Sequence, residues 1–322
     1  MEVRFICELC QNHNGDFRLV EKMVHELADT PVTHIKLQHI YADRLSYRPQ
    51  FEAGCLNSDG AEIVIKRPYR PEYERLKNLE LTYDQNKKFI QLVESVGKIP
   101  LTTCFTHQDV DAIRDLGYRQ IKIASYDCGS EALLRRIRGN FEHYFISTGA
   151  SYDDEIRRAI EIFSGLSASF LHCVTIYPTP MDKLNLGKIN YLASLWSPEE
   201  VGFSDHTDAQ DNSIWALKLA FCLGARVFER HYRVLGPTDS RDGRVSISRT
   251  QLMEFFEFVS MDETAQENQV LKYMHDFKQR ATNPDLKLTS EELLNRNYYR
   301  GRFASSRGDR GPRDAVMNWE LW

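Results

Sequence analysis

Short apolar runs alternate with amphipathic segments from the start of the chain to about residue 259. Apolar runs bounded by polar residues predict buried strands, and apolar positions at helical spacing predict the helices between them. Eight strands are predicted, at Val3–Cys10, His34–His39, Ile99–Cys104, Gln120–Ser125, Tyr144–Thr148, Ser169–Val174, Glu200–His206 and Arg226–Tyr232. Helical segments follow nearly all of them, for example Phe17–Leu27, Tyr83–Val96, Gln108–Leu116, Asp153–Phe163 and Asn212–Leu223.

Strands that alternate with helices indicate a parallel sheet. Eight such units in about 260 residues fit a closed (β/α)8 TIM barrel. A doubly wound open sheet is the alternative, and eight regular repeats favour the barrel over it.

Two stretches do not follow the alternation of strands and helices. Ile40–Leu81 is a long insertion after the second strand, rich in Tyr, Arg, Pro and Asp, as expected for a lid or substrate-contacting arm. After Met261 come a helical segment, Glu263–Arg280, then a helix-start signal at Thr289 and a Gly/Arg-rich tail. We therefore expect a catalytic barrel over residues 1–260 and a helical or irregular extension over 261–322, too short to fold as a domain of its own.

Composition narrows the class of protein. The net charge is −5, and no Lys/Arg block suggests nucleic-acid binding. No apolar run is long enough to span a membrane, and a strand at the very start leaves no room for a signal peptide, so we expect a cytoplasmic protein. The seven cysteines are an odd number and several lie in predicted strands, which suits reduced thiols. Cys7 and Cys10 form a lone CxxC, and without a second pair it does not predict structural zinc.

Two lysines inside predicted strands, Lys36 and Lys122, need an explanation, because a buried ammonium is costly unless paired. One interpretation is an internal ion pair with a strand carboxylate such as Glu8. The other is that both face the barrel mouth, where TIM-barrel enzymes carry their active sites, and bind an anionic substrate. Such a substrate would carry a phosphate and a carboxylate, as phosphoenolpyruvate does. Strand-end hydroxyls that could join the lysines are those of Thr103, Ser125, Ser147 and Ser204.

Two histidines, His206 and His231, each end a predicted strand, with one helix between the two strands. This order places their imidazoles side by side on one rim of the sheet. A single histidine near a strand end is more often structural, but two on successive strands predict a catalytic divalent metal with an open coordination position. His172 lies in an apolar run and is given no role.

Eight motifs in order resemble the sialic acid synthase family, the phosphoenolpyruvate-dependent nonulosonic acid synthases, from about residue 3 to residue 260. The matching segments are Cys7-Glu8 with Asn12-His13-Asn14-Gly15-Asp16, Lys36-Leu37-Gln38, Lys122-Ile123-Ala124-Ser125, Ser147-Thr148-Gly149, Leu171-His172-Cys173, Tyr177-Pro178-Thr179-Pro180, Gly202-Phe203-Ser204-Asp205-His206-Thr207 and Glu229-Arg230-His231.

The resemblance implies a transferase of surface-polysaccharide biosynthesis. It condenses phosphoenolpyruvate with an open-chain aldose, of the N-acetylmannosamine type or related, to give a 2-keto-3-deoxy nonulosonic acid and phosphate. The aldehyde oxygen binds a divalent ion held by His206 and His231, typically Mn²⁺, with Mg²⁺ or Co²⁺ as alternatives. Glu8 and Asp127 are the candidates for handling water and protons. By the same resemblance, phosphoenolpyruvate is held by Lys36, Thr103, Lys122, Ser125, Ser147, Thr175 and Ser204, and the sugar by Gln38, Tyr177 and Asp242.

The chain departs from the family pattern in three ways. Thr175 stands where the family commonly has Asn, and Asp242 lies in a segment that replaces the familiar Gly-Pro-Asp after the second histidine. We also expect no C-terminal antifreeze-like domain, which in typical members contacts the sugar within a homodimer. The insertion or the Arg-rich tail would then supply those contacts, and a homodimer would need another interface.

Two other functions stay open on the same residues. One is a metal-dependent aldolase or sugar isomerase on the same barrel, in which the lysines would have no phosphate to bind. The other is a non-catalytic sugar-binding descendant of a synthase.

Overall fold

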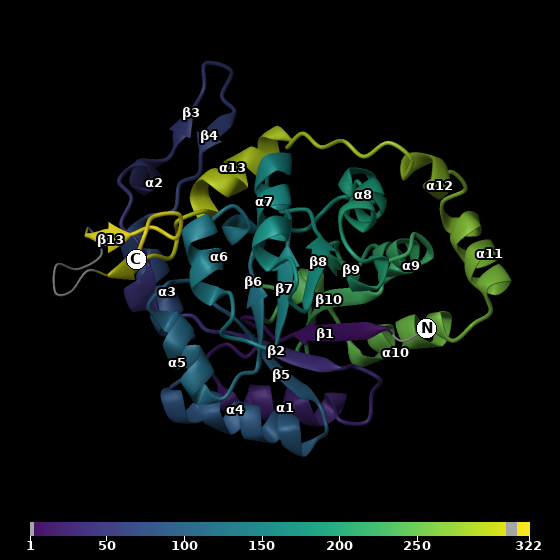
Figure 1. Ribbon diagram of the computed structural model, residues 1–322, viewed down its shortest axis with the longest axis horizontal. Coiled ribbons are helices and arrows are strands. Elements are labelled where there is room, and N and C mark those ends of the chain that lie inside the picture. The colour runs from purple at the N-terminus through teal and green to yellow at the C-terminus, as the bar shows by residue number, and fades with distance from the viewer. Residues whose placement is uncertain (1–2, 307–313) are drawn as a thin grey trace.

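The computed structural model describes residues 3–306 and 314–322 and contains a closed barrel of parallel strands (Figure 1). The strands pair in chain order, and β1 pairs with β10 to close the barrel. The TIM-barrel prediction is therefore confirmed. The barrel strands are β1 (Arg4–Glu8), β2 (His34–Gln38), β5 (Ile99–Thr103), β6 (Gln120–Ile123), β7 (His143–Ser147), β8 (Ala168–His172), β9 (Val201–Asp205) and β10 (Val227–Tyr232).

Helices cover the outside of the barrel (Figure 1). Local sequence sets where several begin: Thr82 and Gln85 form a capping box at the start of α4, and Ser248 and Gln251 do the same for α10. Gly117, in the left-handed conformation, ends α5. The outer helices are α1 (Phe17–Leu27), α4 (Tyr83–Ser95), α5 (Asp109–Leu116), α6 (Glu131–Ile137), α7 (Asp153–Phe163), α8 (Gly187–Leu195), α9 (Trp215–Cys222) and α10 (Arg249–Val259).

The interior of the barrel is layered along its axis. Successive side chains of a strand point to opposite faces, so every second residue points inward. One inward layer is a fully buried apolar cluster of Ile6, Leu101, Phe145, Leu171 and Val227. Two residues further along the same strands, the inward side chains become polar, as at Glu8, Thr103, Ser147 and Glu229. The apolar layer thus closes the floor beneath a polar mouth.

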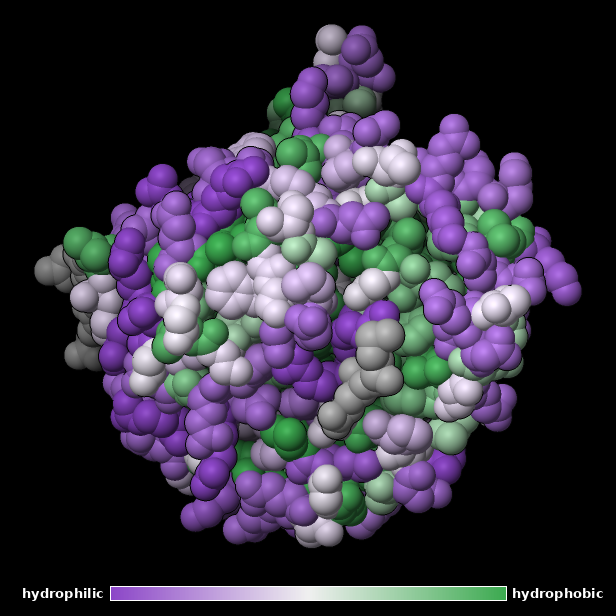
Figure 2. Space-filling view, turned by 45° about the vertical axis from the view of Figure 1, so that its right-hand side comes forward, coloured by the Kyte–Doolittle hydropathy of each residue, from purple (hydrophilic) through white to green (hydrophobic). Residues whose placement is uncertain are grey.

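The insertion after β2 forms a small subdomain at the mouth. Its hairpin stands away from the body of the molecule in both views (Figures 1 and 2). Its base packs on the C-terminal extension, with the rings of Phe51 and Tyr298 5.1 Å apart and an isolated bridge between Leu45 and Phe303. Its elements are η1 (Ala42–Arg44), α2 (Gln50–Ala53), β3 (Cys55–Leu56), β4 (Glu62–Val64) and α3 (Tyr69–Lys77).

The C-terminal extension runs along the barrel and returns to the mouth. The ring of Tyr273 stacks on Trp215 of α9 at 4.1 Å, and the amide of Asn318 donates to the Phe105 carbonyl at 2.8 Å. No helix in the described part of the chain has the length and apolarity needed to cross a bilayer. The elements here are α11 (Glu263–Tyr273), α12 (Phe277–Arg280), α13 (Ser290–Tyr299), β12 (Ser305–Ser306) and β13 (Ala315–Val316). Short elements elsewhere are η2 (Ser125–Asp127), η3 (Met181–Lys183), η4 (Pro198–Glu200), η5 (Gly243–Val245) and β11 (Ser246–Ile247).

Candidate active site

A cavity of about 410 Å³ opens at the carboxyl ends of the barrel strands. It brings together nearly all the residues that the sequence singles out: Glu8, Lys36, Gln38, Thr103, Lys122, Ser125, Asp127, Ser147, Tyr177, Ser204, His206, His231 and Asp242. Thr175 does not line it. That residue is fully buried, and its carbonyl accepts a hydrogen bond from Asn295 of α13 at 2.7 Å.

The floor of the cavity is a chain of buried ion pairs. The ammonium of Lys36 contacts the carboxylate of Glu8 and lies 3.3 Å from that of Glu229. Glu229 also lies 3.2 Å from the ammonium of Lys122. Both lysines are therefore paired with strand carboxylates, as one interpretation of the sequence expects, and both also line the cavity. Their binding of an anionic substrate stays a prediction.

These contacts keep the floor charged. Burial by itself would lower the pKa of Lys36, but the carboxylates of Glu8 and Glu229 outweigh it and the pKa is raised. Burial would raise the pKa of Glu229, but Lys122 and Lys36 hold it well below its usual range. Lys36 and Glu229 are thus held in their charged forms at the floor of the cavity.

Hydroxyl groups surround this floor. Ser147 accepts a hydrogen bond from Lys122 at 2.6 Å, and Ser204 donates to Glu229 at 3.0 Å. Ser125 lies 3.0 Å from the sulfur of Cys173. Each hydroxyl can reorient toward a bound oxyanion, because a hydroxyl both donates and accepts.

The two histidines lie side by side at the mouth. Their ring centroids are 5.5 Å apart, and the ring of Tyr177 lies 4.5 Å from that of His206. Burial, reinforced by His231, lowers the pKa of His206 well below its usual value, so its imidazole is neutral at physiological pH. A neutral imidazole is the form that binds metals.

The residues that directly precede the two histidines hold β9 and β10 together. Asp205 and Arg230 face away from the barrel axis, are fully buried, and pair with 2.5 Å between Oδ2 and Nη1. Because this pair links β9 to β10, it sets the relative position of the two imidazoles.

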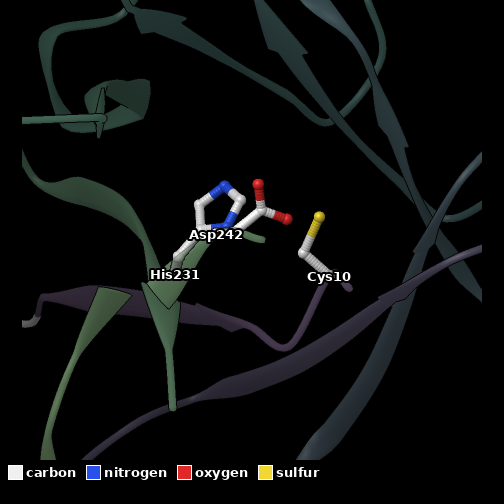
Figure 3. A group of neighbouring side chains, drawn as sticks. All are labelled: Cys10, His231 and Asp242. Atoms are coloured by element: carbon white, nitrogen blue, oxygen red, sulfur yellow. The ribbon is translucent and has the colours of Figure 1, made fainter. Parts of the chain in front are cut away.

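A group of donors next to His231 fits a divalent cation. Within the described residues, ligand atoms of Cys10, His231 and Asp242 lie within 4.8 Å of one another (Figure 3). Nδ1 of His231 and Oδ2 of Asp242 are buried and find no hydrogen-bond partner in the described part of the chain, and the same holds for Nδ1 of His206. Buried polar atoms are rarely left unpartnered, so these donors fit a metal that completes them. His206 lies outside the 4.8 Å group but lines the same cavity.

Asp127 is a second candidate for proton transfer. It is 6% exposed and accepts hydrogen bonds from Asn318 at 2.8 Å and Ser130 at 3.0 Å. Burial raises its pKa from 3.8 to about 6, against the opposing effect of those hydrogen bonds. Both protonation states are therefore accessible near neutral pH.

Several cavity residues were not singled out as site residues from the sequence. Glu229 was noted among the polar residues at the strand ends but was given no role, although it lies two residues before His231 and so shares its inward face. Cys10 was considered only as half of a CxxC pair. The sequence pointed to the insertion and the Arg-rich tail as segments that contact the substrate, but it did not single out the individual residues at the rim: Arg67, Arg75, Arg241, Tyr299, Arg302 and Asn318.

The fold and this site define a class: a (β/α)8 enzyme whose cavity floor pairs two lysines with two carboxylates and whose mouth gathers donors that fit a metal. The sequence profile of the NeuB family matches residues 23–270. The chain therefore belongs to the NeuB family, the phosphoenolpyruvate-dependent nonulosonic acid synthases, and is a condensing enzyme of that kind.

Similarities to individual proteins agree with this family assignment. The chain is 27% identical to pseudaminic acid synthase of Campylobacter jejuni over 270 residues, covering 82% of this chain and 75% of that one. It is 30% identical to N,N'-diacetyllegionaminic acid synthase of Legionella pneumophila over 234 residues, covering 70% and 63%. The fold matches a sialic acid synthetase from Leptospira borgpetersenii, solved in complex with citrate, with a TM-score of 0.66, 24% identity and 93% coverage of both chains.

Proposed function

We propose that the chain condenses phosphoenolpyruvate with the open-chain form of an aldose in a metal-dependent reaction that releases phosphate. One arrangement carries the proposal: Lys36 and Lys122 line the same cavity as His206 and His231. The lysines supply charge for a phosphate and a carboxylate, and the imidazoles supply neutral nitrogen donors.

Phosphoenolpyruvate would lie on the cavity floor. Lys36 and Lys122 would turn part of their hydrogen bonding from Glu8 and Glu229 to the incoming anion. Thr175 does not line the cavity, so it would contribute to phosphoenolpyruvate binding indirectly, through the hydrogen bond that its carbonyl accepts from Asn295 of α13. The hydroxyls that we assign to the same anion are those of Thr103, Ser125, Ser147 and Ser204.

The metal is proposed to be Mn²⁺, with Mg²⁺ or Co²⁺ as alternatives, held by His206 and His231. When bound, a divalent ion supplies Lewis-acid polarisation of the sugar aldehyde. Carbon C3 of phosphoenolpyruvate then attacks the aldehyde carbon, water adds at C2, and the tetrahedral product of that addition expels phosphate. Asp127, with a pKa of about 6, can take or give a proton in these steps, whereas Glu8 is engaged by Lys36.

The sugar would extend from the metal toward the rim. Gln38, Tyr177 and Asp242 are the candidates for its contacts near the strands. Beyond them, the cavity wall comes from the insertion and from the extension, through Arg67 and Arg302. We therefore propose a barrel over residues 1–260 whose substrate recognition is completed by the extension over 261–322.

The test is a condensation assay with phosphoenolpyruvate, Mn²⁺ and a panel of N-acylated hexosamines, diacetamido aldoses and neutral aldoses. We expect phosphate release and a product whose mass equals the aldose plus phosphoenolpyruvate and water less phosphoric acid, both abolished by a chelator. Turnover of an aldose or a keto acid without phosphoenolpyruvate would favour an aldolase or isomerase. No phosphate from any aldose in the panel would contradict the proposal.

A further inference from the structure

Cys10 follows β1 and presents its thiol to His231 and Asp242. All three side chains are directed to one place at the cavity mouth, although Cys10 is far from His231 and Asp242 in the sequence (Figure 3). Cys10 is 5% exposed and lines the cavity.

The donors around Cys10 are otherwise unused. Neither Nδ1 of His231 nor Oδ2 of Asp242 has a hydrogen-bond partner in residues 3–306 and 314–322, and His231 is only 8% exposed. An imidazole and a carboxylate with free, buried lone pairs beside a thiol are a combination that binds first-row transition metals.

The backbone holds the thiol in place. Cys10 has a φ of +41°, a left-handed conformation that costs a residue with a Cβ about 1 kcal/mol or more and would suit glycine better. Its amide donates to Oε1 of Glu8 at 2.8 Å. Asn12 then ties this loop to the other side of the site, because its amide donates to the Tyr232 carbonyl at 2.7 Å and to Oγ of Ser246 at 2.8 Å.

We propose that Cys10 is a thiolate ligand of the catalytic metal, together with His231 and Asp242, with His206 as the adjoining donor. This inference rests on the metal dependence in the proposed function and moves Asp242 from the sugar to the metal. A soft thiolate favours Co²⁺ or Zn²⁺ over Mn²⁺ more strongly than nitrogen and oxygen ligands alone. The chain would therefore prefer a softer ion than a site of two histidines would.

The experiment is anaerobic titration of the full chain, freed of metal, with Co²⁺ and with Mn²⁺. Thiolate ligation gives Co²⁺ an intense near-ultraviolet charge-transfer band. We expect this band in the wild type and in Cys7→Ala, which removes a buried thiol from the same segment, and its loss in Cys10→Ala. Loss of an outer-shell partner costs about 10–100-fold in metal affinity, so removal of a direct ligand should weaken Co²⁺ binding by at least about tenfold. Mn²⁺ binding should weaken less.

A further variant keeps the test independent of folding defects. Cys10→Asp places a hard ligand where aspartate tolerates the left-handed backbone, and it should bind Mn²⁺ better than Cys10→Ala without the charge-transfer band. Co²⁺ bound to the wild type without that band would overturn the inference, and the condensation assay on the same sample would still judge the proposed function. Failure of the wild type to bind either ion would overturn the inference and the metal dependence together.

Discussion

The carboxylate of Glu229 lies 3.2 Å from the side-chain nitrogen of Lys122, and both residues are at most 5% exposed at the floor of the cavity. The same carboxylate reaches Lys36 at 3.3 Å. Both lysines are thus held in place by a resident carboxylate, with which the phosphoenolpyruvate that we propose to bind here would have to compete.

Separating the structural and binding roles of Lys122 needs two variants. Lys122→Met should lower the free energy of unfolding by about 3–5 kcal/mol, because it leaves Glu229 partly unpaired. Lys122→Met combined with Glu229→Gln should recover much of that stability while phosphoenolpyruvate still binds weakly. Urea unfolding and phosphoenolpyruvate titration measure the two effects. Wild-type affinity in the double variant would show that Lys122 does not bind the substrate.

Asp127 should make stability depend on pH in a defined window. Its pKa is raised from 3.8 to about 6, so between these pH values the native state binds more protons than the unfolded state. The free energy of unfolding therefore falls as pH rises through the window, by about 1.4 kcal/mol per pH unit and about 3 kcal/mol in all. Asp127→Asn should remove this contribution, and urea unfolding from pH 4 to pH 7 measures it. Parallel profiles for wild type and variant would contradict a raised pKa.

Arg67 should contribute to sugar binding. Its side chain lines the cavity and lies over the ring of Tyr298, and it forms no ion pair with any residue of the described ranges. A hydrogen bond from a charged group contributes about 1.5–3 kcal/mol, so Arg67→Ala should raise the KM for the aldose by about tenfold or more. The KM for phosphoenolpyruvate should stay unchanged.

The neighbouring Lys66 provides the control for this variant, because it is exposed and does not line the cavity. Lys66→Ala removes the same charge from the insertion and should leave both KM values unchanged. An equal effect of the two substitutions would mean that the insertion acts through its overall charge.

Asn12 should act as a positioning residue for the metal donors. Besides its two donated bonds, its Oδ1 accepts from Ser240 at 2.6 Å, so it links the loop after β1 to the loop that carries Asp242. Asn12→Ala should lower Co²⁺ affinity by about 10–100-fold, as expected for loss of an outer-shell partner.

Asn86 is the matched control for Asn12. It is also buried and also donates to two carbonyls, of Leu81 and Thr82, at the start of α4. Asn86→Ala should cost similar stability, about 1–3 kcal/mol, while Co²⁺ affinity stays unchanged. Equal losses of affinity in both variants would show that Asn12 acts only through stability. Calorimetric metal titration and thermal unfolding separate these cases.

Much of the fold could be predicted because it depends on local patterns. The alternation of buried strands and amphipathic helices is written in the chain itself, and it determined the barrel. The carboxyl ends of all parallel strands lie at the same end of the barrel. Because His206, Lys36 and Ser204 lie at or near those strand ends, they were all expected near one another. Strand alternation also indicates that Glu229 points into the barrel, because it lies two positions before His231 on the same strand.

What the sequence by itself determined is the barrel, its polar mouth and the residue types gathered there. Only the tertiary structure decided which of those residues touch. That Glu229 pairs with both lysines depends on the register of β2, β6 and β10, and the approach of Cys10 to Asp242 depends on two loops that are 232 positions apart. The rim is the clearest case, since Arg67 and Arg302 meet at the cavity only because the insertion packs on the extension. Such contacts carry no local pattern, because their free energy comes from burial between segments that are distant along the chain.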